Sequence, residues 1–115
     1  MDTPELMEQV RRAFVARDAD LLSSLMHPEV ELHLVSSPQP IVGREAAREW
    51  YRAAFTNRLR FEADAAGEAQ EDGSYLMRGR LSWFGPGGGS DREGAWIITF
   101  RDGLVGSIRS FEPSV

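Results

Sequence analysis

The spacing of apolar residues changes near Asn57, and this change restricts the possible folds more than any other feature of the sequence. Before Asn57, apolar side chains recur every three or four positions, as they do along one face of a helix. After it they alternate at every second position, as in a half-buried strand. Helices followed by strands predict an α+β fold, with helices packed on one face of a strongly curved, mostly antiparallel sheet that encloses a pocket.

The first half of the chain contains clear helix boundaries. Thr3, Pro4 and Glu5 form a helix start, in which the Thr3 hydroxyl is the expected N-cap. The expected elements are a helix from residue 3, a short helix capped by Asp18 and Asp20 and ended by Pro28, a strand at 29–35, and a helix from Gly43 to Phe55.

The second half is predicted to be a meander of four strands, at residues 61–69, 75–84, 93–101 and 105–112. Asp72-Gly73 and Asp102-Gly103 are suited to hairpin turns, because both residue types tolerate positive φ. The glycine-rich stretch 85–90 is interpreted as a hairpin tip, or alternatively as a lid over the pocket. A single domain over residues 1–115 is expected, since no repeat or linker divides the chain.

The composition excludes several kinds of chemistry. The 115 residues include no cysteine, and all 13 basic residues are arginine. Disulfides, thiol nucleophiles and thiolate metal sites are therefore excluded, as are a lysine Schiff base and a phosphate-binding P-loop lysine. His27, His33 and scattered carboxylates do not form a metal motif, and His27 is interpreted as a helix-end cap. We expect neither a metal nor a cofactor.

Charge and hydropathy also limit the partners. The net charge of −5 does not suit a nucleic-acid-binding surface, which needs basic residues. No apolar run approaches the roughly 18 residues of a membrane span. The acidic start lacks the order of a signal peptide, so a cytoplasmic protein that does not bind membranes is expected.

Three segments resemble one known family: "ARDADLLSSLMHPEVELH", "IVGREAAREWY" and "ITFRDGLVGSIRSF". Together with the order of elements, they are similar to the SnoaL-like group of the nuclear transport factor 2-like superfamily. The resemblance implies a cone-shaped fold with an apolar cavity, and a homodimer formed through the outer face of the sheet. It also implies a small-molecule ligand, because members include isomerases, cyclases, hydrolases and non-catalytic binding domains.

The start "MDTPELMEQVRRAFVA" is similar to a bacterial ketosteroid isomerase. That enzyme uses a tyrosine and a protonated aspartic acid as hydrogen-bond donors and a second aspartate as the base. The corresponding positions here are Phe14 for the tyrosine, Trp96 or a neighbour for the acid, and Leu34 for the base. Each lost donor removes roughly 3–4 kcal/mol of transition-state stabilisation, so the isomerase mechanism is excluded.

His33, in "VELHL", is the first candidate for a general base. Strand alternation places Val30, Leu32 and Leu34 on the inner face and His33 on the outer face. A bulge before Pro38 would instead turn His33 inward, and both alternatives stay open. The other candidate catalytic residues are Tyr51 as a donor and Glu112 as a base at the pocket rim.

The expected pocket is apolar and binds a small apolar molecule. Its predicted lining is Phe14, Leu32, Leu34, Trp50, Tyr51, Met77, Trp83, Trp96, Ile98 and Ile108. One hypothesis is an isomerase, cyclase or hydrolase acting on a cyclic polyketide-, steroid- or terpenoid-like compound. The second is a non-catalytic ligand-binding or dimerisation module of the same fold. A third is a cavity filled by the protein's own aromatic side chains.

Overall fold

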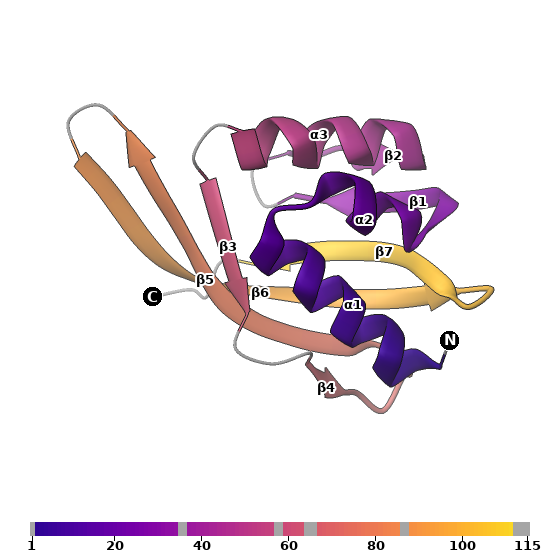
Figure 1. Ribbon diagram of the computed structural model, residues 1–115. Helices are drawn as coiled ribbons and strands as arrows, with labels where there is room; N and C mark the ends of the chain where they lie inside the picture. The colour runs from indigo at the N-terminus through magenta and orange to yellow at the C-terminus, as the bar shows by residue number, and fades with distance from the viewer. Residues whose placement is uncertain (1, 35–36, 57–58, 64–66, 86–87, 112–115) are drawn as a thin grey trace.

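A computed structural model of the chain describes residues 2–34, 37–56, 59–63, 67–85 and 88–111, without the side chains of 59–63, 81, 83–85, 88–92 and 111. In this part three helices lie on one side of a curved sheet (Figure 1). The predicted α+β class is therefore confirmed. The elements are α1 (Thr3–Ala16), α2 (Ala19–Ser24), β1 (Met26–His33), β2 (Ile41–Val42), α3 (Arg44–Thr56), β3 (Leu59–Ala63), β4 (Glu68–Ala69), β5 (Tyr75–Gly85), β6 (Gly88–Arg101) and β7 (Leu104–Phe111).

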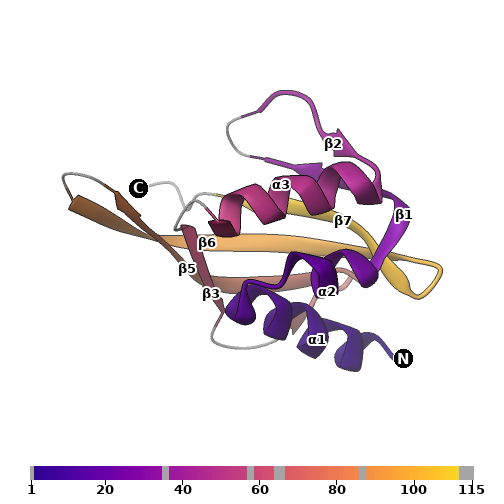
Figure 2. The same ribbon diagram turned by 45° about the horizontal axis from the view of Figure 1, so that its top comes forward.

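The strands form one sheet in the order β2-β1-β7-β6-β5-β3, with β4 paired to β5 outside this path. Every pair is antiparallel except β1 and β7, which run parallel with Leu32 opposite Ile108. The first and last of the described strands, β1 and β7, are thus neighbours inside the sheet. The β5–β6 hairpin continues past β3 and the helices, as both views show (Figures 1 and 2).

The caps of the first two helices fix where they begin. The carboxylate of Asp2 accepts the N–H of Glu5 at 2.9 Å, so Asp2, and not the predicted Thr3, is the N-cap of α1. Pro4 lies in the first turn, where its missing N–H costs nothing. Asp18 caps α2 by accepting the N–H of Leu21 at 3.0 Å, as one of the two predicted caps.

The first strand begins earlier than predicted. It runs from Met26 to His33, whereas the sequence suggested 29–35, because α2 already ends at Ser24 and does not continue to Pro28. The register of β1 against β7 shifts between Met26 and Glu31. Pro28, which has no N–H to donate, lies within this irregular part, where the strand tolerates it.

The strands of the second half agree with the prediction, with two differences. The expected strand at 61–69 is two separate strands, β3 and β4, and the short edge strand β2 was not predicted. The β6–β7 hairpin turns at Asp102 and Gly103, with φ values of 54° and 77°, as predicted for this pair. Most of the stretch 85–90 belongs to the paired strands, with Gly85 opposite Gly88, and residues 86–87 lie outside the described part.

The hydrophobic core lies between the helices and the concave face of the sheet. From α1 it takes Leu6, Val10 and Phe14, which are spaced by one helical turn as the sequence predicted. The start of α3 is tied to β1, since the Arg44 guanidinium donates to the carbonyl oxygen of Met26 at 2.6 and 3.0 Å. Among the described residues, no helix is both long and apolar enough to cross a bilayer.

Candidate functional site

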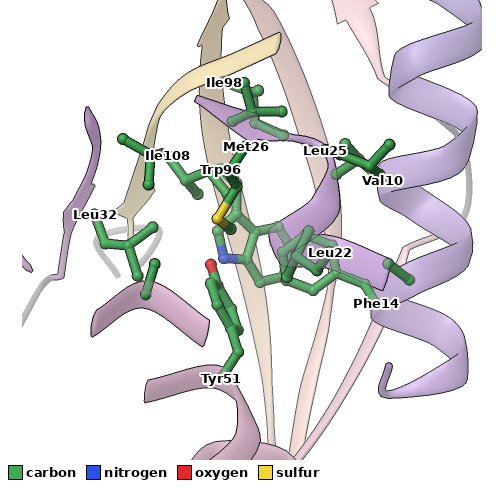
Figure 3. Packing of buried hydrophobic residues seen from close by; sticks show 14 of the residues in the cluster. Val10, Phe14, Leu22, Leu25, Met26, Leu32, Tyr51, Trp96, Ile98 and Ile108 are labelled. Carbon is green, nitrogen blue, oxygen red and sulfur yellow. The ribbon is translucent and has the colours of Figure 1, made fainter. Parts of the chain in front are cut away.

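Tyr51 of α3 is the centre of an aromatic cluster between the helices and the sheet. Its ring packs edge-to-face with Phe14 at 5.6 Å and with Trp50 at 5.0 Å, and it lies 5.7 Å from Phe55, measured between ring centroids. Phe14 in turn lies 5.7 Å from Trp96 of β6. These separations are those of favourable aromatic pairs. The hydroxyl of Tyr51 points toward the indole of Trp96 (Figure 3).

Burial controls the chemistry of Tyr51. The residue is only 2% exposed, and desolvation raises the pKa of its phenol well above the ordinary value of 10.0. The hydroxyl is therefore neutral at physiological pH and serves as a hydrogen-bond donor or acceptor, not as a base. Trp96 adds an indole N–H, which only donates. The cluster thus places two polar groups, the Tyr51 hydroxyl and the Trp96 indole N–H, within apolar surroundings.

Aliphatic side chains from four strands complete the walls of this site. Leu32 of β1, Met77 of β5, Ile98 of β6 and Ile108 of β7 are each no more than 1% exposed. Figure 3 shows Leu32, Ile98 and Ile108 in the same cluster as Tyr51 and Trp96. Because almost none of their surface is accessible to water, these side chains pack closely against their neighbours and fill the space beside Tyr51. The structure therefore shows these predicted pocket residues together, packed against one another.

Four other predicted site residues are only half-buried or lie, at least in their side chains, outside the described part. Leu34 is half-buried and directly follows β1, and Trp50 is half-buried at the edge of the core. The backbone of Trp83 lies in β5, but its side chain is outside the described part. Glu112, the predicted rim base, also lies outside the described residues.

His33 lies on the outer face of the sheet. Val30 and Leu32 are fully buried, whereas Glu31 is exposed and His33 half-buried, so β1 alternates as its sequence indicated. The imidazole Nε2 of His33 is 3.9 Å from a carboxylate oxygen of Glu31, on the same face. His33 therefore lies on the outer face of the sheet, whereas Tyr51 of α3 lies on the opposite, concave side.

His27 is not a helix-end cap, as the sequence suggested, but part of β1. Its Nδ1 accepts the N–H of Glu29 at 3.0 Å, and its Nε2 lies 3.3 Å from a carboxylate oxygen of Asp102. It thereby links the first strand to the β6–β7 turn. In the described part, no three histidine or acidic side chains are close enough to hold a metal ion.

The predicted pocket lining left out Phe55, although its ring lies against Tyr51 and it is only 6% exposed. The spacing indicated this contact, because the two residues are four positions apart on one helix and therefore share a face. Met26 and Leu22 also pack into the core around Trp96 (Figure 3). Neither residue was among the predicted pocket residues.

Solved structures with this architecture define the class of fold. An uncharacterised cystatin-fold protein from Novosphingobium aromaticivorans is 18% identical, with a TM-score of 0.79 over 97% of this chain and 99% of that one. SalBIII, an epoxide hydrolase/cyclase-like enzyme in pyran ring formation in salinomycin, is 19% identical, with a TM-score of 0.78 over 95% and 88%. A protein named as a polyketide cyclase from Pseudomonas putida is 13% identical, with a TM-score of 0.79 over 98% and 92%.

The fold is therefore that of the cystatin-like and ketosteroid isomerase-like α+β proteins. A family model for the SnoaL-like domain matches residues 7–108, and the chain belongs to this family, as its sequence segments indicated. No curated protein matches the chain at significant similarity.

Proposed function

We propose that this SnoaL-like protein binds a small, largely apolar molecule on the concave face of its sheet, beside Tyr51. The observation that carries the proposal is a neutral hydroxyl held at the centre of an aromatic and aliphatic cluster. Ligand sites in proteins commonly combine apolar walls with a few polar groups that orient the ligand. Tyr51 and Trp96 supply such groups here.

The ligand enters by displacing side chains, because the interior is filled in the structure. Trp50 is only half-buried and lies at the edge of the core, with its ring 5.0 Å from that of Tyr51. Movement of the Trp50 ring would open a path to Tyr51. A ligand that binds only this open form shifts the population toward it.

Mass spectrometry of the freshly purified protein under native conditions tests the proposal. We expect a retained small molecule of a few hundred daltons, released on unfolding. The chain offers a matched control, because its other tyrosine, Tyr75, packs on Phe100 and not on Tyr51. Tyr51→Phe should reduce ligand retention, whereas Tyr75→Phe should not. Equal retention in both variants would show that the ligand does not use the Tyr51 hydroxyl.

An enzyme of cyclase or hydrolase type is the second candidate, and the names of the structural neighbours favour it. Tyr51 would then donate a hydrogen bond to an oxygen that gains charge in the transition state. A chemical step would be detected by mass spectrometry, as a difference in mass between the compound added to the protein and the compound released from it. His33→Ala tests the predicted base, and unchanged turnover of that substrate would exclude this role.

The same spectra count subunits, and we propose a homodimer formed through the outer face of the sheet. Ile97 is half-buried there, with Leu76 and Arg109 directly opposite on the neighbouring strands. Arg78 is exposed on the same face. Ile97→Glu should convert the dimer to a monomer, and a wild-type monomer at micromolar concentration would contradict the proposal.

A further inference from the structure

An open depression lies outside the core, where the end of α1, the start of α2 and the end of α3 meet. Its volume is about 520 Å³, which is within the range of small-molecule sites. Phe55 and Ala19, at 6% and 8% exposure, are its most buried residues and form an apolar floor. The complete lining is Ala16, Arg17, Asp18, Ala19, Asp20, Arg52, Phe55 and Thr56.

Two of the four charged residues around the depression neutralise each other. Asp20 and Arg52 form an ion pair at 3.0 Å. Arg52 also lies 3.4 Å from Glu49, and Asp20 lies 4.0 Å from Arg48. These charges tie α2 to α3, and each already has a partner of opposite sign.

The remaining two charged residues are Asp18 and Arg17. Asp18 accepts the backbone N–H of Leu21 as the cap of α2. Arg17 is exposed, and within the described part of the chain its guanidinium has neither an ion-pair nor a hydrogen-bond partner. Its backbone is fixed in the left-handed region at φ 55°, with its N–H donating to Phe14. The depression therefore combines an apolar floor with one uncommitted cation on a fixed backbone.

We propose that this depression binds a small amphipathic anion, whose ring system covers Phe55, Ala16 and Ala19 and whose carboxylate or sulfonate faces Arg17. The guanidinium pairs with the charged end of such a molecule, and the exposed edges of these three side chains contact its ring system. This site is distinct from the one on the concave face, from which the ring of Phe55 separates it, and it does not depend on the proposed function.

Two fluorescent probes test the site directly. 8-Anilinonaphthalene-1-sulfonate has both an aromatic body and an anionic group, and N-phenyl-1-naphthylamine has the same kind of body without the charge. Ala16→Trp fills the depression, and Val15→Trp places the same side chain on the neighbouring exposed position, outside the lining. We expect the wild type and Val15→Trp to bind both probes, and Ala16→Trp to lose most of this binding. No binding to the wild type, or full binding to Ala16→Trp, would overturn the proposal.

A second pair of variants tests the role of charge. Arg17→Gln should weaken sulfonate binding roughly two- to fivefold, as expected for an exposed ion pair, and should leave the uncharged probe unaffected. Arg12→Gln is the matched control, because Arg12 is also exposed on α1 but lies beside Glu8 at 3.5 Å and outside the depression. Added salt should reduce the effect of Arg17→Gln. Equal weakening by both variants would mean that the general charge of the protein, and not Arg17, attracts the anion.

Tryptophan at residue 16 does not block the concave face, so loss of the concave-face ligand and loss of this site are separable.

Discussion

Replacement of Phe14 by alanine tests how tightly the concave face is packed. Phe14 is 1% exposed, and its ring contacts both Tyr51 and Trp96. Removing a buried phenylalanine side chain costs about 3–5 kcal/mol, from lost burial and from the cavity that remains. Domains of this size are stable by roughly 5–15 kcal/mol, so Phe14→Ala should remain folded but lose a large share of its stability.

Urea unfolding followed by far-UV circular dichroism measures this loss. We expect the midpoint to fall by roughly 2 M urea with an unchanged slope, and the Tm to fall by about 12–20 °C. Val15→Ala is the control on the same helix, because Val15 is 50% exposed and should change stability by less than about 0.5 kcal/mol.

The result also distinguishes a filled interior from an open one. If Phe14→Ala loses less than about 1 kcal/mol, the ring already borders empty space, and our view of the interior as filled is wrong. If the interior is filled, the variant contains a new apolar cavity. Benzene should then bind there and raise the Tm of Phe14→Ala, but not that of the wild type.

Three further predictions concern individual side chains and backbone positions. Burial raises the pKa of Tyr51, so as pH rises above about 10 the unfolded chain loses this proton and the folded chain keeps it. Stability should therefore decline in that range, and Tyr51→Phe should decline less steeply in urea titrations at several pH values. Gly43 has φ 101°, which other residues rarely adopt, so Gly43→Ala should cost roughly 1–2 kcal/mol by thermal unfolding. Asp18→Ala removes the cap of α2 and should cost about 1 kcal/mol, whereas a change below about 0.3 kcal/mol would show that the cap contributes little.

Periodicity predicted most of the fold because it reflects burial directly. The stripe of Leu6, Val10 and Phe14 faces the core, and the alternation through Val30 and Leu32 fixes the inner face of β1. The parallel pairing of β1 with β7 could not be predicted in this way. Which strands become neighbours depends on contacts across the whole chain and not on local spacing.

The sequence predicted several side chains that lie together in the structure, but not that they fill the interior. Phe14 and Trp96 were identified from the resemblance to a ketosteroid isomerase and Tyr51 as a candidate donor, and the structure brings these three rings together. Whether such residues surround an empty pocket or fill it depends on rotamers and on the curvature of the sheet, neither of which a sequence pattern records. The depression at Arg17 was not predicted, since it arises where the ends of three helices meet.

The parallel contact between β1 and β7 has a consequence for synthesis on the ribosome. Met26–His33 is made well before its partner Leu104–Phe111, with α3 and the strands β2 to β6 between them. Until β7 is made, β1 has one unpaired edge. The apolar residues of α1 and α3 can then pack only on the strands that have already been made. Such long-range pairing slows folding and leaves the nascent chain exposed to aggregation. The strand β7 therefore joins β1 to β6, and premature termination before it would leave β1 without this neighbour.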